Sequence, residues 1–288
     1  HGITGRPLGI KLFDFQGIVQ SPQTTINAHE LLKGCELKNW QFDHLVSSQQ
    51  EFARWQMRVE DSKYMNLSQG YKVYTEERKQ AGTSQIANIN RKCRKLQREI
   101  GTVRFEWHTD QKKVFDTILE WKSAQRKQTE TFDILQFDWV KQFLNQIRST
   151  QVDGFEGVLS TLYVKDQLVA AHLGMKTKTV FHHWFPVYDQ ALYKYSPGSI
   201  LLLKTAEAAA ERGVQRIDLG KGKERYKTSL GSGSISVGEG VVELRPVHHA
   251  VRSLWFRTRE RIRTSPFRSF AQYPKRVIRS FNTKNAMN

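Results

Sequence analysis

The chain has 288 residues, of which 39% are hydrophobic and seven are tryptophan, a composition that excludes an intrinsically disordered protein. It contains no run of about 18 apolar residues, so the sequence predicts no helix that spans a bilayer. The formal net charge of +17 favours partners that carry phosphate, which include nucleic acid, anionic lipid and the pyrophosphate of a cofactor, without choosing among them.

The first part of the chain carries short and mixed patterns. Residues 5–15 are expected to form a loop or an edge strand, and a helix around residues 27–32 is expected to end at Gly34. Alternating side chains predict strands at 40–45 and 71–74. Residues 48–61 fit a helix and a strand equally well.

The clearest helix of the amino half spans residues 84–100. Its apolar side chains recur at three- and four-residue steps and form one stripe, made by Ile86, Ile89, Cys93, Leu96 and Ile100. Five cations lie off this stripe, namely Arg91, Lys92, Arg94, Lys95 and Arg98. A solvated helix face and a phosphate-binding face both fit this pattern. A strand at 103–107 and helices around 114–122 and 138–147 are expected to follow.

The carboxyl half has the pattern of an antiparallel meander followed by a crossover. Apolar or alternating runs at 157–164, 168–175 and 179–187 are joined by links short enough for hairpins. A polar loop at 188–195 then leads into a helix that begins at Pro197 and ends at Gly213, and residues 214–219 form a short buried strand. This order predicts a parallel strand pair with a right-handed crossover, within the series β-β-β-α-β-α-β.

Common catalytic motifs are absent from the sequence, among them GxxxxGK[ST], HExxH, CxxC and GxSxG. The adjacent histidines at 182–183 and at 248–249 would point to opposite faces of a strand, so neither pair chelates a metal alone, and we expect no metal site. Cys35 and Cys93 lack metal-ligand spacing, which indicates ordinary thiols in a reducing compartment.

The helix start at residues 196–199 has the character of an anion site. Free N–H groups and the helix dipole favour a phosphate there, and Gly198 removes a side chain where a pyrophosphate would approach. The next strand ends at residues 218–220 and is followed by Tyr226 and Lys227. Because ligands bind beyond the carboxyl ends of strands in α/β sheets, a functional site is expected here; a capped helix with a charged loop is the alternative.

A set of short motifs follows the chain in a fixed order: Gly5-Arg6-Pro7-Leu8-Gly9, Arg91-Lys92-Cys93-Arg94-Lys95-Leu96, Gly101, Tyr188-Asp189, Tyr193-Lys194-Tyr195-Ser196-Pro197-Gly198, Leu201-Leu202, Gly213, Ile217-Asp218-Leu219-Gly220 and Tyr226-Lys227. In order and spacing, over nearly the whole chain, they resemble the CelD/BcsL-type acetyltransferases of cellulose and other exopolysaccharide synthesis, which carry a GNAT-like domain.

The resemblance implies an α/β fold with a GNAT-like mixed sheet flanked by helices, in a tandem arrangement of two GNAT-like halves like that of the Fem-type aminoacyl transferases. It implies a truncated first half at residues 1–108, an acyltransferase domain at 109–246 and a basic amphipathic tail at 247–288. In that tail Glu260 is the only acid among many lysines and arginines.

The resemblance also implies an N-acyltransferase that moves an acyl group from acetyl-CoA or another acyl-CoA to an amine in polysaccharide or cell-envelope synthesis. The expected donor-binding residues are Ser196, Pro197, Gly198, Ser199, Ile200 and Lys227. Backbone N–H groups of the aromatic strand at 180–185, or those of Ser199 and Ile200, are expected to serve the donor. Tyr226 is the candidate acid that protonates the leaving thiolate, and Asp218 or His183 is the candidate base. Each of these three also fits a structural role, as a packed aromatic, a loop cap or a core histidine.

Two other interpretations stay open. The usual pyrophosphate signature Q/RxxGxG/A is absent, and Ser196-Pro197-Gly198-Ser199 occupies its place, so one alternative is a Fem-like transferase that uses aminoacyl-tRNA. The other is a truncated, non-catalytic module that binds an anionic membrane or nucleic acid through its basic helix and tail. The expected acceptor is a small-molecule or polysaccharide amine. The expected location is the cytoplasm, with peripheral attachment to the inner membrane as an option.

Overall fold

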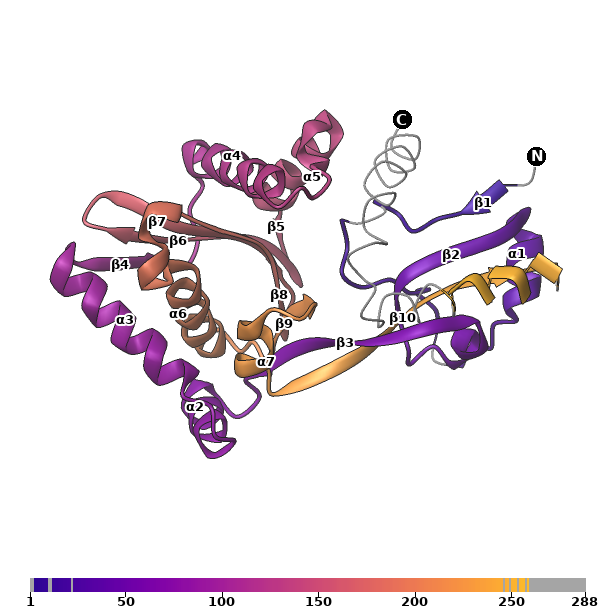
Figure 1. The fold of residues 1–288 in the computed structure, drawn as a ribbon, viewed down its shortest axis with the longest axis horizontal. Coiled ribbons are helices and arrows are strands. Elements are labelled where there is room, and N and C mark those ends of the chain that lie inside the picture. Colours follow the sequence, from indigo (N-terminus) through magenta and orange to yellow (C-terminus); the bar gives the residue numbers. More distant parts are fainter. Residues whose placement is uncertain are drawn as a thin grey trace. The chain divides into compact units, whose positions relative to one another are not determined.

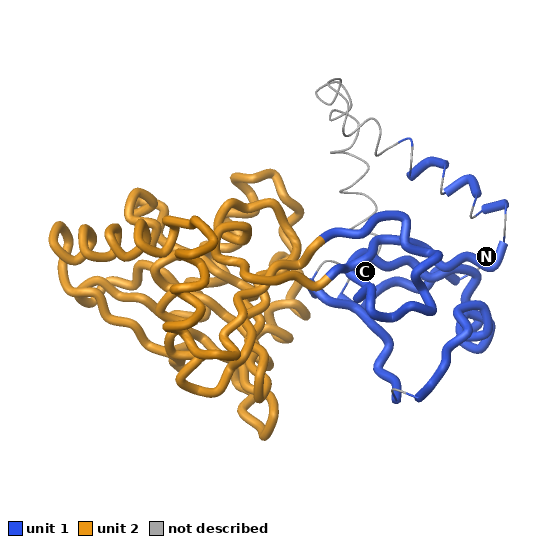
Figure 2. Tube along the Cα trace, turned by 90° about the horizontal axis from the view of Figure 1, so that it is seen from below, with its two compact units in different colours: residues 1–60, 236–288 blue, residues 61–235 orange. Residues whose placement is uncertain are grey.

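The computed structural model of the chain describes residues 3–9, 12–21, 23–245, 247–248, 250–252, 254–256 and 258. The chain divides into two compact units, unit 1 with residues 1–60 and 236–288 and unit 2 with residues 61–235 (Figure 2). No boundary between these units falls at residue 108, and the division of the chain into an incomplete first half and an acyltransferase domain stays a prediction. Most of the predicted amphipathic tail at 247–288 lies outside the described residues.

Unit 1 is built around the strand β2 (Leu37–Val46). The strand β1 (Ile3–Gly5) pairs parallel with β2, and β10 (Gly233–Glu243) pairs antiparallel with it. The helix α1 (Ala28–Gly34) begins after Asn27, whose Oδ1 accepts hydrogen bonds from two N–H groups of the first turn. The 3₁₀ helix η1 (Gln50–Trp55) leads into β3 (Gln56–Asn66). The core of this unit is aromatic and aliphatic, made by Ala28, Leu32, Phe42, Leu45, Phe52, Trp55 and Val242.

Unit 2 contains one mixed sheet with helices on both faces. Its strands lie in the order β3-β9-β8-β7-β6-β4, and β5 pairs with β6. The remaining strands are β4 (Val103–Glu106), β5 (Gln151–Val152), β6 (Phe155–Val164), β7 (Gln167–Lys176), β8 (Val180–Tyr188) and β9 (Arg216–Lys221). The helices are α2 (Tyr71–Gln80), α3 (Gln85–Glu99), α4 (Lys112–Gln128), η2 (Ile134–Gln136), α5 (Asp138–Ser149), η3 (Gln190–Tyr195), α6 (Pro197–Glu211) and α7 (Arg225–Leu230). All strand pairs in this sheet are antiparallel except β8 with β9, which are parallel.

The two faces of this sheet are covered by different helices. Helices α4 and α5 contact β6, β7 and β8 on one face, whereas α6 packs on the same three strands from the other face and α3 packs on α6 (Figure 1). We name these the α4–α5 face and the α6 face. Helix α6 lies close to the sheet because small side chains line its buried side, among them Thr205, Ala206 and Ala209. The close approach fixes where its amino end lies.

The sequence patterns identify most of these elements. The predicted α/β class, a mixed sheet flanked by helices, is confirmed, and so is the order β-β-β-α-β-α-β from β6 to β10. Helix α3 buries the predicted apolar stripe at Ile89 and Leu96, and β8 and β9 form the predicted parallel pair. The undecided segment at 48–61 forms η1 and the first part of β3.

The predicted strand at 71–74 is wrong, because these residues begin α2. Tyr71 and Tyr74 lie three residues apart and share one helix face, where the buried Tyr74 hydroxyl donates to the Leu230 carbonyl at 2.6 Å. An alternating strand would place Tyr71 and Val73 on one face, whereas the helix leaves Val73 exposed and turns Tyr71 toward the buried Tyr74. Four residues are too few to separate these two patterns from the sequence alone. The predicted loop at 188–195 contains the 3₁₀ helix η3.

The contact between β6 and the end of α5 gives a stability prediction. A Cβ added at Gly157 would overlap the Ile147 carbonyl oxygen of α5, so we expect Gly157→Ala to lower the unfolding free energy by about 2–3 kcal/mol. Urea denaturation measures this value. In the matched control Gly34→Ala the added Cβ meets nothing within 4 Å, and we expect a change below about 1 kcal/mol. Equal losses in both variants would contradict the packing argument.

Candidate functional site

The parallel strands β8 and β9 pair over a short stretch and then part. Their partners run from Val180 with Arg216 to His182 with Asp218. Beyond His182, β8 continues along β7 as far as Tyr188, and beyond Asp218, β9 continues along β3 as far as Lys221. The sheet therefore opens at the carboxyl ends of two parallel strands, which is where ligands bind in α/β sheets.

Strand β8 carries a β-bulge at the point of parting. Leu173 of β7 faces Phe185, and Met175 faces His182, so two steps along β7 match three steps along β8. Gly174 lies opposite the extra residue, and a Cβ there would come within 2.6 Å of the His182 carbonyl oxygen. The bulge brings His183 and Trp184 to the place where β8 leaves β9.

His183 is buried on the α6 face at this bulge. Its ring stacks on the ring of His172 of β7, with centroids 4.0 Å apart and an interplanar angle of 19°. Its Nδ1 has no hydrogen-bond partner within the described structure. Burial, followed by the nearby charges of His182, Lys227 and Lys122, lowers the pKa of His183 to about 3. At neutral pH it is therefore a neutral imidazole, which can accept a hydrogen bond.

Lys227 and Tyr226 begin the helix that follows β9. The Lys227 side chain is buried, and its Nζ donates to the Lys221 carbonyl at 2.9 Å and lies 3.5 Å from Glu224 Oε2. Gly222 leaves room for this ammonium, because a Cβ there would lie 3.0 Å from Nζ. Tyr226 is half-buried against the core of unit 2. The positive charge of Lys227 is one of the causes that lower the pKa of His183.

Asp218 lies on the other face of the sheet. Its neighbours Ile217 and Leu219 belong to the core beneath α6, so alternation along β9 turns Asp218 toward the α4–α5 face. Its carboxylate is buried, and Oδ1 lies 2.9 Å from Arg216 Nε in an ion pair that lacks hydrogen-bond geometry. The two candidate bases, His183 and Asp218, are thus both next to the parting of β8 and β9 but on opposite faces.

The first turn of α6 has fewer N–H groups to offer than the sequence suggests. Ser196 adopts a left-handed conformation with φ of 55°, and Pro197 has no N–H. The N–H groups of Ser199 and Ile200 both donate to the Ser196 carbonyl, at 3.0 and 3.1 Å. These two groups, one of the two sets that the sequence offers to the donor, are therefore engaged within the turn. Of the N–H groups in this turn, the one on Gly198 takes no part in these two hydrogen bonds.

A lysine of α3 strengthens the positive end of α6. Lys92 Nζ donates to Ser196 Oγ at 2.7 Å, and the first turn of α6 contains no acidic residue. A helix start carries a partial positive charge, so the added ammonium makes this end attractive to an anion. Further exposed cations continue along α3, namely Arg91, Arg94, Lys95 and Arg98, with Glu99 as the acid beside Lys95 and Arg98.

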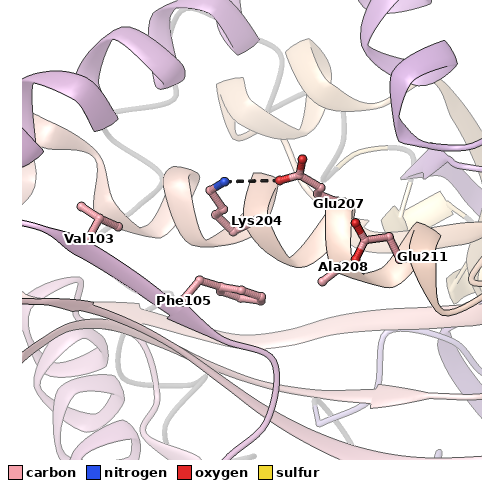
Figure 3. A pocket seen from close by; sticks show the side chains of 6 residues that line it. All are labelled: Val103, Phe105, Lys204, Glu207, Ala208 and Glu211. Carbon is pink, nitrogen blue, oxygen red and sulfur yellow. Dashed lines mark hydrogen bonds and ion pairs between the residues drawn. The ribbon is translucent and has the colours of Figure 1, made fainter.

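A separate groove of about 280 Å³ lies between α6 and the strand β4. Its apolar walls are Val103, Phe105 and Ala208, and an ion pair between Lys204 and Glu207 at 3.3 Å spans its rim together with Glu211 (Figure 3). None of the residues predicted for acyl transfer lines this groove. The described residues contain no group of three or more His, Cys, Asp or Glu able to hold a metal ion, and none of the described helices is long and apolar enough to cross a membrane.

Sequence reasoning missed two residues of this region. His172 lies inside an apolar strand, and its partner is a backbone group of the next strand, so nothing local in the sequence marks it. Lys92 was recognised only as one of five cations on α3, whereas the structure distinguishes it by its contact with Ser196. To single out Lys92 from the sequence, one would need to know that α3 packs against the start of α6.

A family described as Acetyltransferase (GNAT) domain matches residues 83–228, which extend from the start of α3 into α7. No protein of curated function matches the sequence.

Several solved structures are similar in fold. The C-terminal domain of the putative lysylphosphatidylglycerol synthetase of Agrobacterium fabrum has a TM-score of 0.52 and 12% identity, over 80% of this chain and 74% of that one. FemX has a TM-score of 0.51 and 9% identity, over 78% and 77% of the two chains. A tandem GNAT protein from the clavulanic acid biosynthesis pathway has a TM-score of 0.41 and 11% identity, over 76% and 68%. At these identities, the first two show a shared fold alone.

The depressed pKa of His183 predicts a loss of stability in acid. Between its ordinary value of 6.5 and about 3, the unfolded chain binds a proton at this position and the folded chain does not, so the unfolding free energy falls as pH falls through this window. We expect the loss between pH 7.5 and 5 to be about 2 kcal/mol smaller in His183→Gln than in the wild type. Urea denaturation at both pH values measures this difference. The exposed His248 supplies the control, since His248→Gln should leave the loss unchanged.

Proposed function

The chain belongs to the acetyltransferase (GNAT) domain family, and from this we propose that it transfers an acyl group from acyl-CoA to the nitrogen of an amine. The observation that carries the proposal is the parting of the parallel strands β8 and β9, together with the start of α6, which follows β8 after η3 and has an added ammonium beside it. This arrangement offers an opening in the sheet for a thioester and a positive end for the phosphates of its carrier.

The donor's pyrophosphate would bind at the start of α6. Gly198 supplies an N–H and no side chain, and Lys92 supplies a positive charge 2.7 Å from Ser196 Oγ. Ser196, Pro197, Ser199 and Ile200 shape this turn, while the N–H groups of Ser199 and Ile200 act within it. Lys227, at the other side of the opening, would bind an acidic group of the donor or acceptor.

The transfer forms one carbon–nitrogen bond and breaks one carbon–sulfur bond. The amine attacks the thioester carbonyl, and its surplus proton passes to a base, while the departing thiolate takes a proton from an acid. We assign the acid to Tyr226, which follows the second strand of the parallel pair. Asp218 and His183 are the two candidates for the base, and they lie on opposite faces of the sheet. In our proposal the acceptor is an amine of an amino sugar or a nascent exopolysaccharide, as the CelD/BcsL-type resemblance implies, and the reaction takes place in the cytoplasm or at the inner membrane surface.

A second candidate donor is aminoacyl-tRNA. The specific observation in its favour is the row of exposed cations along α3, which continues from Lys92 at the start of α6 to Arg98. A row of cations beside a helix start would neutralise several phosphates of an RNA backbone, and binding would then weaken steeply with salt.

The acid role of Tyr226 predicts a kinetic effect. We expect Tyr226→Phe to lower kcat for thiol release from acetyl-CoA about 100-fold with an amino sugar as acceptor, because the thiolate then leaves unprotonated. The KM for acetyl-CoA should change little. Tyr193 is 69% exposed on η3, and Tyr193→Phe serves as the control with unchanged kcat. An unaltered kcat in Tyr226→Phe would assign the proton to another group.

The anion role of the α6 start predicts a loss of donor affinity. Lys92→Met should weaken acetyl-CoA binding about tenfold by calorimetry, since it removes one charge-assisted contact, and Gly198→Trp should abolish binding by filling the approach. Lys112→Met removes an exposed lysine of α4, on the other face of the sheet, and should leave affinity unchanged.

The same variants separate the two donors. If the wild type binds tRNA tightly and shows no heat with acetyl-CoA, the acyl-CoA proposal is wrong. In that case Lys92→Met should reduce the salt dependence of tRNA binding by about one unit in the slope of log affinity against log salt.

A further inference from the structure

We infer that His172 is a positioning residue of this site, which holds the β8 bulge and the His183 ring in place for transfer. The inference rests on the proposed acyltransferase function for its consequence in catalysis, and on geometry alone for its consequence in structure. His172 lies in β7 and is fully buried on the α6 face.

Three contacts connect His172 to the opening of the sheet. Its Nε2 accepts a hydrogen bond from the backbone N–H of Trp184 at 3.2 Å. Its Nδ1 lies 3.2 Å from Ser160 Oγ of β6. Its ring stacks on His183 at 4.0 Å. One side chain thus links β6, β7 and the bulged residues of β8.

These contacts fix the tautomer of the ring. A backbone N–H is always a donor, so the Nε2 that receives it carries no hydrogen, and the hydrogen of the neutral ring must lie on Nδ1. Nδ1 then donates to Ser160 Oγ. A neutral imidazole supplies one acceptor and one donor on opposite edges of a flat ring, and the flat ring also provides the surface on which His183 stacks. Burial and the neighbouring positive groups hold the pKa of His172 well below its ordinary value, so the ring stays neutral.

The hydrogen bond to Trp184 explains how the bulge is maintained. An extra residue in a strand interrupts the ladder and leaves a backbone N–H without a strand partner. His172 supplies the acceptor for the Trp184 N–H, and loss of this buried hydrogen bond would cost about 1–3 kcal/mol. Without His172, regular pairing of β8 with β7 would be favoured over the bulge. A slip by one residue would turn His183 to the α4–α5 face, because successive side chains of a strand point to opposite faces.

A second histidine of unit 2 makes a comparable bond away from the opening. His108 Nδ1 accepts the backbone N–H of Leu159 of β6 at 3.1 Å, beyond the end of β4. This bond offers a matched control, since it is the same interaction without the bulge and without His183.

The test compares His172→Gln with His172→Asn. Glutamine is long enough to accept the Trp184 N–H, whereas asparagine reaches Ser160 and stops short of Trp184. Hydrogen exchange of the Trp184 amide, followed by NMR, reports the bond, and steady-state transfer from acetyl-CoA reports kcat and KM. We expect His172→Asn to speed exchange at Trp184 at least tenfold and to lower kcat about 100-fold, with KM for acetyl-CoA within about threefold. His172→Gln should keep both values within about tenfold of the wild type.

The controls decide between positioning and general stability. His108→Leu should speed exchange at Leu159 and leave kcat unchanged. Ser160→Ala leaves the Nδ1 hydrogen without its acceptor and should move exchange and kcat in the same direction as His172→Asn, to a smaller extent. If His172→Asn does not fold, Ser160→Ala and His172→Gln together carry the comparison.

Unchanged exchange at Trp184 in a folded His172→Asn, or in Ser160→Ala where asparagine does not fold, would overturn the inference, as would faster exchange with unchanged kcat. A loss of kcat in His108→Leu equal to that in His172→Asn would also overturn it, because both effects would then reflect stability. If the wild type transfers no acyl group from acetyl-CoA, the proposed function fails, and exchange at Trp184 still decides whether His172 holds the bulge.

Discussion

The structure of unit 2 depends on how β8 satisfies its backbone hydrogen bonds after it leaves β9. A buried strand that loses one neighbour exposes N–H and carbonyl groups, and these must find partners or ligands. On one side β8 keeps β7 as its neighbour as far as Tyr188. On the other side it has β9 only as far as His182. Strands β6 and β7 and helix α6 hold the core around the opening. The sheet therefore stays together without a continuous ladder between β8 and β9.

The helix after β8 turns this opening into an electrostatic site. Small side chains let α6 approach the sheet, so its positive end is fixed next to the end of β8, where a Cβ on Gly198 would lie 3.2 Å from the ring of Tyr188. Helix α3 packs on α6 and delivers Lys92 to the same place. Two weak effects, a helix dipole and a single ammonium, therefore act on one spot and are held there by apolar packing. The Tyr195 hydroxyl donates to Glu99 at 2.8 Å and links η3 to α3 just before this turn.

Periodicity in the sequence was sufficient to predict the helices and strands that bury one clear face. Helix α3 and strands β6, β7 and β8 could be predicted because many consecutive side chains repeat one pattern. The prediction at 71–74 was wrong because four residues are too few to distinguish a repeat of two from one of about 3.6. The site could be predicted only in part, since Gly198, Asp218 and Tyr226 follow recognisable starts and ends of elements. The role of His172 could not, because it depends on the register between β7 and β8 and on a bulge that no local pattern reveals.

The placement of the two candidate bases bears on the path of the acceptor. The start of α6 and Lys92 belong to the α6 face, so a donor bound there would occupy the opening from that side. The amine would then reach the thioester from the α4–α5 face, where Asp218 lies. His183, with a pKa of about 3, holds a proton too weakly to take one from an amine at neutral pH. The Asp218 carboxylate is buried and forms an ion pair with Arg216 at 2.9 Å. In our proposal Asp218 is therefore the stronger of the two candidate bases, and His183 is a neutral imidazole that can accept a hydrogen bond within the opening.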